Sequence, residues 1–253
     1  MAHNHLGVAY LWSRDWDRAR HAFDDAIRTT RTITPEAGVG LPHLNQCLAD
    51  VTRLADDGPP SGRRPPMQGL RALARRFAQI VEAKPGGALS LSSQATLECM
   101  SRVGLAIVHI WLNEMDEAER LLAAARKIMD SAPIKPWLNV FYAWGLTELA
   151  WASGDFVSAQ AAAAVLVQLA TSVEHEQMAG FGLLLGFQIA EAQGKTAQAL
   201  QALRQLRRRE QMIRGEAVQN RERAVQWPLD ERGMEASPSS IQVTPHAAKM
   251  VWM

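Results

Sequence analysis

The chain has 253 residues, 47% of them hydrophobic, and a formal net charge of +1 at pH 7. This balance argues against nucleic-acid or membrane binding through charge. No apolar stretch approaches the roughly 20 residues of a membrane-spanning helix, and no signal peptide is evident. Cys47 and Cys99 lie far apart in apolar helical patterns, which indicates buried, reduced thiols. We therefore expect a cytoplasmic protein without a membrane segment.

The N-terminal residues predict a helical hairpin. Small and apolar side chains recur at spacings of three and four residues, as they do where two helices meet along a seam. They are Leu6, Gly7, Tyr10, Ala19, Phe23 and Ala26. Asp15 stands where it can cap the second helix. Arg14 occupies the turn position between the helices, where glycine is usual in such hairpins.

The next part of the chain predicts two amphipathic helices separated by a loop. Apolar residues at helical spacing run from Leu44 to Leu54 and again from Leu70 to Val81. Between them, residues 57–66 contain four prolines and two glycines, which favour an exposed loop. A second helix-breaking run, residues 84–87, precedes a long predicted helix from about Ser93 to Leu112.

Three further hairpins follow at a regular interval. Ala118, Ala159 and Ala199 each open the second helix of a pair and lie 41 and 40 residues apart. A fixed period of this kind is typical of stacked helical units. Gly154 and Gly194 fall at the turn, where a left-handed backbone conformation is wanted.

The first hairpin resembles the tetratricopeptide repeat, and the later units resemble it less closely. The resemblance covers residues 1–207 and implies an all-α fold, a right-handed α-solenoid of about five antiparallel helix pairs. A period near 40 residues exceeds the roughly 34 of the standard repeat. In this respect the chain is similar to the looser arrays of bacterial transcriptional regulators.

The last helix is predicted to extend well beyond its unit, over residues 196–227. Positions such as Leu203, Leu206 and Asn220 alternate by three and four residues, as in a coiled-coil seam. Two interpretations remain open, a solvated helix and a helix that forms a homodimer. Interleaved acids and the lack of base-stacking aromatics argue against nucleic-acid binding. Residues 228–253 have no period and predict disorder.

A second resemblance concerns residues 208–225, which look like the connector between sensor and output domain in bacterial diguanylate cyclases. That family carries its active site in a GGDEF loop, and the chain has no such loop. No catalytic or metal residue is therefore carried over. The resemblance implies the sensor part of a truncated or frame-shifted regulator without catalytic activity of its own.

Motifs that would indicate chemistry are missing from the sequence. We find no phosphate-binding loop, no HExxH, no GxSxG and no dinucleotide fingerprint, and we predict no cofactor and no metal. His109 has apolar neighbours and predicts a packed histidine. Glu174, His175 and Glu176 open a helix, where acids suit the helix dipole better than they suit a metal site.

The resemblance implies that the first helix of each unit lines a concave groove. The groove residues it assigns are apolar or aromatic with a few hydrogen-bonding groups, a composition that suits a protein or peptide partner. They are Trp12, Ile107, Trp111, Phe141, Trp144, Glu148, Trp151, Phe181, Gln188 and Glu191. The alternative is that long helices close the groove and the same residues form a core. The surroundings of Glu148, Gln188 and Glu191 discriminate between the two.

These observations favour an interaction module that acts as sensor or scaffold in a bacterial regulatory protein. Two alternatives remain, a structural adaptor without a signalling role and an enzyme on an all-helical toroid. The enzyme would need converging acids, for which Glu148 and Glu191 are the suggestive pair.

Overall fold

The computed structural model describes residues 2–33, 40–57, 67–83, 91–132 and 135–212. Within these ranges the chain is all-helical and contains no strand, which confirms the predicted class. The helices are α1 (Ala2–Trp12), α2 (Trp16–Ile33), α3 (Leu41–Asp57), α4 (Met67–Glu82), α5 (Leu91–Trp111), α6 (Met115–Ser131), α7 (Leu138–Ala152), α8 (Phe156–Ser172), α9 (Glu176–Ala192) and a further helix over residues 196–212.

Several predicted boundaries fall outside this part of the chain. The predicted loop 57–66 begins at the last residue of α3, and residues 58–66 lie outside the described residues. The predicted long helix 196–227 is described as far as residue 212. The rest of that helix and the predicted disordered tail 228–253 also lie outside the described residues.

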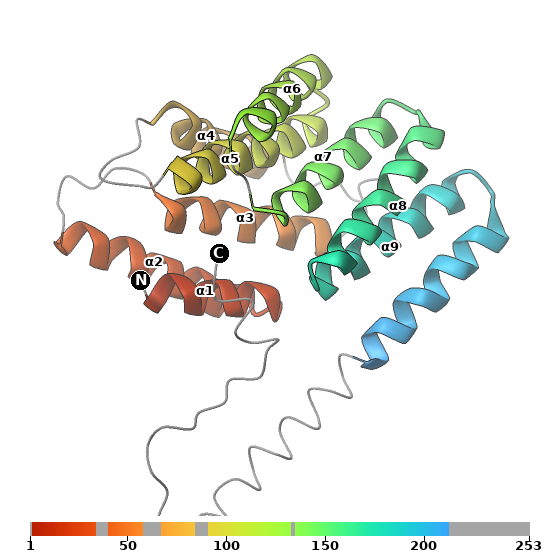
Figure 1. Cartoon of the computed structure of the whole chain (residues 1–253), viewed down its shortest axis with the longest axis horizontal. Helices are drawn as coiled ribbons and strands as arrows, with labels where there is room; N and C mark the ends of the chain where they lie inside the picture. The colour runs from red at the N-terminus through yellow and green to blue at the C-terminus, as the bar shows by residue number, and fades with distance from the viewer. Residues whose placement is uncertain (1, 34–39, 58–66, 84–90, 133–134, 213–253) are drawn as a thin grey trace, which may run out of the picture.

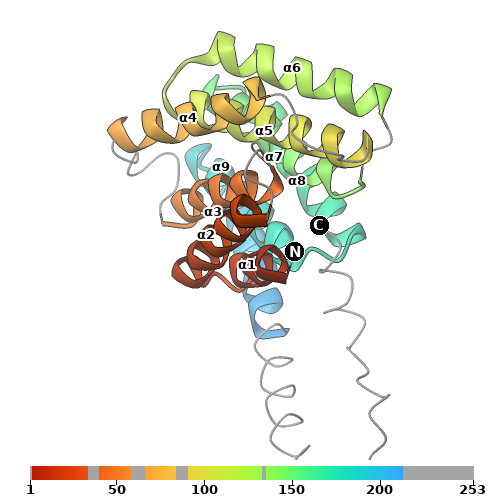
Figure 2. The ribbon, with the colours of Figure 1, turned by 90° about the vertical axis from the view of Figure 1, so that its left-hand side faces the viewer.

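The helices are arranged in two layers (Figure 1). Each helix packs against the next one in the chain, and α1, α3, α5, α7 and α9 also contact one another in succession. These odd-numbered helices therefore form a continuous inner layer, with α2, α4, α6 and α8 outside it. The view from the side shows α6 on the far side of α5 from α1 (Figure 2).

One turn geometry recurs at five interhelical connections of three residues each. The middle residue has a positive φ, between 57° and 77°, and the N–H of the third residue donates to the carbonyl five positions earlier. This is the Schellman arrangement, which satisfies the carbonyls at a helix end. The middle residues are Arg14, Asn113, Gly154, Glu174 and Gly194. The last three lie 20 residues apart, so the turn recurs at every half-period.

A buried alanine follows each of these turns at the same distance. The backbone N–H of Ala19, Ala118, Ala159 and Ala199 donates to the carbonyl of the third turn residue, and all four side chains are buried. The structure confirms that the four alanines occupy equivalent places. Ala179 is a fifth, which the sequence analysis did not single out. A methyl group at this point lets the new helix lie close to the preceding one.

Glycines on the inner helices allow equally close contacts farther along. A Cβ atom at Gly7 would lie 2.4 Å from the ring of Phe23 on α2. A Cβ atom at Gly104 would lie 2.5 Å from the ring of Phe77 on α4. Both phenylalanines are fully buried. The two rings therefore fill the space that a side chain on the facing helix would otherwise take.

The helix over residues 196–212 packs against α9. Leu206 approaches Gly180 of α9, and Arg209 pairs with Glu176 and donates to Thr171 Oγ1 at 2.7 Å. Leu200 and Met212 are exposed, at 47% and 58%. Part of the predicted coiled-coil seam is thus already in contact with the chain's own helix. Among the described helices, none is both long enough and apolar enough to cross a bilayer.

Candidate functional site

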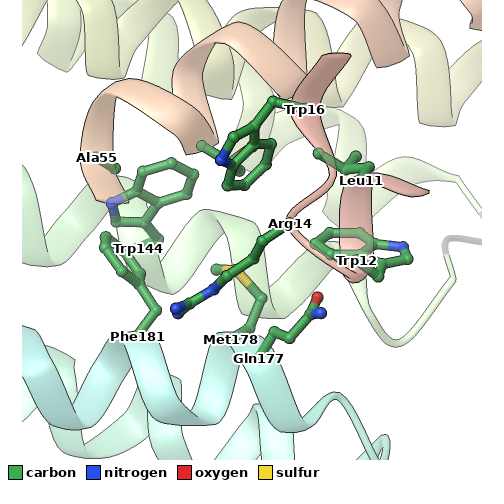
Figure 3. A pocket seen from close by; sticks show the side chains of 10 residues that line it. Leu11, Trp12, Arg14, Trp16, Ala55, Trp144, Gln177, Met178 and Phe181 are labelled. Carbon is green, nitrogen blue, oxygen red and sulfur yellow. The ribbon is translucent and has the colours of Figure 1, made fainter. Parts of the chain in front are cut away.

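Two clefts open between the N-terminal helices and α7 and α9. The first, which we call the Phe181 cleft, is a small hollow of about 40 Å³ that is open to solvent. Its lining comes from α1, α2, α3, α7 and α9 and includes Leu11, Trp16, Ala55, Trp144, Met178 and Phe181. Arg14 extends across the cleft from the α1–α2 turn (Figure 3). Five helices from four hairpins thus converge on one largely apolar hollow.

The second, which we call the Lys135 cleft, has a volume of about 130 Å³ and is also open to solvent. Apolar residues of α1, α3 and α7 form most of its walls, among them Val8, Leu44, Leu48 and Phe141. Asn45, Ser93, Thr96 and Lys135 add polar groups. The cleft is therefore amphipathic, in contrast to the largely apolar Phe181 cleft.

Trp12 lines both clefts. Its ring centroid lies 6.1 Å from that of Phe141 on α7 and 4.2 Å from that of His175 at the start of α9, the latter edge-to-face. Phe141 also lies 5.9 Å from Trp137 and 6.3 Å from Trp144. Aromatic pairs at such separations contribute about 0.5–1.5 kcal/mol beyond area burial. Side chains from the first hairpin therefore meet those of α7 and the start of α9.

Three nitrogen atoms of this aromatic group have no hydrogen-bond partner. Trp12 Nε1, Trp137 Nε1 and His175 Nε2 are shielded from solvent and find no acceptor among the described residues. His175 is partly buried as a residue, but its ring is enclosed, and burial lowers its pKa to about 4. Its Nδ1 accepts from the N–H of Met178 at 3.5 Å, which leaves the proton on Nε2. A buried donor left unsatisfied costs about 1–3 kcal/mol.

Glu148 lies in a different setting, one helical turn from Trp144. Its carboxylate accepts from Trp144 Nε1 at 2.9 Å and from Trp111 Nε1 at 3.3 Å, which joins α7 to α5. The side chain is 1% exposed, and no cation lies among its hydrogen-bond partners in the described ranges. Burial raises the pKa of Glu148 to about 7, although both indole N–H groups favour the charged form.

The ten predicted groove residues separate into three groups in the structure. Trp12, Phe141, Trp144 and Phe181 come together in the aromatic group beside the clefts, with Trp144 and Phe181 centroids 5.0 Å apart. Ile107, Trp111 and Glu148 are buried in the core. Trp151 and Gln188 are half-buried outside both clefts, and Glu191 is exposed at the end of α9. Buried Glu148 and exposed Glu191 do not form an acid pair.

Several residues beside the clefts were not predicted from the sequence. Trp16, Lys135 and Trp137 line a cleft, and His175 contacts Trp12, but none was assigned to the groove. All four lie in or beside an interhelical connection. A search confined to the first helix of each unit passes over such positions. The recurrence of tryptophan next to helix starts, at residues 16 and 137, was the available signal.

The described residues offer little for metal or thiol chemistry. In these ranges no three His, Cys, Asp or Glu side chains gather as metal ligands would. Cys47 and Cys99 are buried free thiols, and burial raises the pKa of each to about 11. Both are therefore protonated and unreactive near neutral pH.

Comparison with known proteins adds no relative to this picture: no family model, no curated protein and no solved structure matches the chain.

Proposed function

We propose that the chain is a tetratricopeptide-like interaction module, a right-handed α-solenoid of about five helix pairs. Five turns of one geometry and a buried alanine after each of them support this proposal. A repeated turn followed by a repeated small residue stacks successive helices with the same local geometry. The inner layer of odd-numbered helices corresponds to the concave side of such an array.

The function we propose is binding of an apolar segment of a partner protein or peptide, as a sensor or scaffold in a bacterial regulatory protein. The observation that carries it is the Phe181 cleft, where aromatic residues from separate hairpins line one open hollow. Aromatic anchors in a concave pocket are typical of protein-binding hot spots. Lack of catalytic activity, lack of a cofactor and a cytoplasmic location remain predictions from the sequence.

A peptide selection tests this proposal. Random peptides displayed on phage would be selected against the whole chain, and the winners measured by fluorescence anisotropy. We expect peptides with clustered aromatic or aliphatic residues. Phe181→Ala, which truncates a lining residue, is expected to weaken their binding at least tenfold.

The matched control is Val157→Ala, because Val157 is 76% exposed on α8 and lines neither cleft. Circular dichroism would establish that both variants are folded. Selection of no peptide, or equal affinity of the two folded variants, would contradict binding in the Phe181 cleft.

We further propose that the helix beginning at residue 196 relays binding to an output domain or to a second copy of the chain. Exposed Leu200 and Met212 leave apolar surface for such a contact. The connector resemblance adds no structural support, because most of residues 208–225 lie outside the described residues. Light scattering of the whole chain and of Leu200→Glu tests the dimer, and a monomer at all concentrations would contradict it.

A further inference from the structure

The Lys135 cleft combines an apolar body with a polar mouth. Val8, Leu44 and Leu48 contribute aliphatic walls from α1 and α3, and Phe141 contributes an aromatic one from α7. Lys135 lies just before α7 and is exposed. A ligand that filled this cleft would bury an apolar chain or ring and keep one polar group near the mouth.

The charge of the cleft selects the sign of that polar group. Lys135 is the one charged side chain among the described residues that line the cleft. No carboxylate in the described ranges pairs with Lys135. By contrast, Arg28, Arg102, Arg120 and Arg126 each form an ion pair within their own helix. An ammonium group beside low-dielectric walls attracts an anion more strongly than it would in bulk water.

Hydrogen-bonding capacity points the same way. The Nε1–H groups of Trp12 and Trp137 are donors without an acceptor among the described residues. Both tryptophans line this cleft, and the ring of each contacts the ring of Phe141. Trp12 is only 7% exposed, so water does not satisfy its N–H. Asn45 already donates to Asn4 Oδ1 at 3.0 Å. The described residues around the cleft thus leave both indole donors without an acceptor.

We propose that the Lys135 cleft binds a small amphipathic monocarboxylic acid, with its aliphatic body between α1, α3 and α7 and its carboxylate at Lys135. The carboxylate would pair with the ammonium group of Lys135, the one charged side chain among the described lining residues. This ligand class differs from the peptide partner proposed above and uses a different cleft. The inference stands on its own, since neither Phe181 nor Trp16 lines the Lys135 cleft.

Calorimetric titration of the whole chain with decanoate, below its micelle concentration, tests the inference. We expect saturable binding of decanoate and much weaker binding of decyltrimethylammonium, which has a chain of equal length and the opposite charge. Lys135→Gln, which keeps most of the side-chain length, is expected to weaken decanoate binding about three- to tenfold. Trp137→Phe, which removes only the N–H donor and part of the ring, is expected to weaken it by a smaller factor.

The matched control is Lys127→Gln, because Lys127 is exposed on α6 in the outer layer and lines neither cleft. No saturable heat with decanoate would overturn the inference. So would equal binding of the cationic amphiphile, or equal losses from Lys135→Gln and Lys127→Gln. None of these outcomes would affect the peptide proposal, which the Phe181→Ala experiment tests separately.

Discussion

Two tryptophan clusters lie at helix α7 and differ in the partners of their indole N–H groups. In the core cluster, Trp111 and Trp144 donate their indole N–H groups to Glu148. In the cleft cluster, Trp12 and Trp137 flank Phe141 and find no acceptor among the described residues. Trp144 of the core cluster also lines the Phe181 cleft, whereas both tryptophans of the cleft cluster line the Lys135 cleft.

The difference shows how one residue type serves two purposes in the same helix layer. In the core cluster both indole N–H groups are satisfied by Glu148, which links α5 to α7. In the cleft cluster the unsatisfied N–H groups lower the stability of the fold at that point. A buried polar group without a partner lowers the stability of a fold, and places where a protein keeps such a group are candidates for function.

The largest expected effect is the loss of the acceptor in the core cluster. Glu148→Ala should lower the free energy of unfolding at pH 5 by about 4 kcal/mol, since it leaves a cavity and two buried N–H groups without a partner. Urea unfolding followed by circular dichroism measures it. Glu191→Ala, on the exposed end of α9, should change it by less than about 0.5 kcal/mol. Equal small losses would mean that Glu148 does not hold the two helices together.

The next effect is a pair of opposing pH dependences. Burial raises the pKa of Glu148 from 4.5 to about 7, so between these values the folded chain holds a proton that the unfolded chain has lost. The free energy of unfolding therefore falls by about 3 kcal/mol as the pH rises through this window. Burial lowers the pKa of His175 from 6.5 to about 4, so there the unfolded chain holds the extra proton. Its contribution rises by about 3 kcal/mol from pH 4 to pH 6.5.

In the wild-type chain these two contributions nearly cancel, and single substitutions should separate them. Glu148→Gln should make stability rise more steeply with pH than in the wild type. His175→Asn, which preserves a capping acceptor at the start of α9, should make it fall. Urea unfolding between pH 4 and pH 7.5 gives the difference curves. If the free energy of unfolding of both variants changed with pH as it does in the wild type, neither the His175 ring nor the Glu148 carboxyl group would be enclosed as described.

The smallest expected effect compares one substitution in both clusters. Trp144→Phe removes a donor bonded to Glu148, whereas Trp12→Phe removes a donor that has no partner. Both lose similar ring volume, so the difference between their free energies of unfolding reports the hydrogen bond. We expect Trp144→Phe to be more destabilising by about 1–2 kcal/mol at neutral pH. A larger loss from Trp12→Phe would reverse the comparison.

Much of the local architecture was predictable from the sequence. The evenly spaced alanines and turn glycines specified the hairpins, because a small side chain at a helix crossing and a left-handed residue at a helix end are local requirements. The predicted left-handed positions at Gly154 and Gly194 are confirmed, and Arg14 adopts the same conformation without being glycine. The half-period turn at Glu174 was missed, since its residue types are unusual for a left-handed turn.

The sequence by itself therefore determined the helical class, the hairpins and the apolar character of the inner layer. Only the tertiary structure decided which of those apolar residues are core and which border a cleft. Trp12 meets Phe141 and His175 although these residues lie far apart in the sequence, and no local pattern encodes such a contact. The same packing encloses Glu148 within α7 and leaves Lys135, just before α7, at an open mouth.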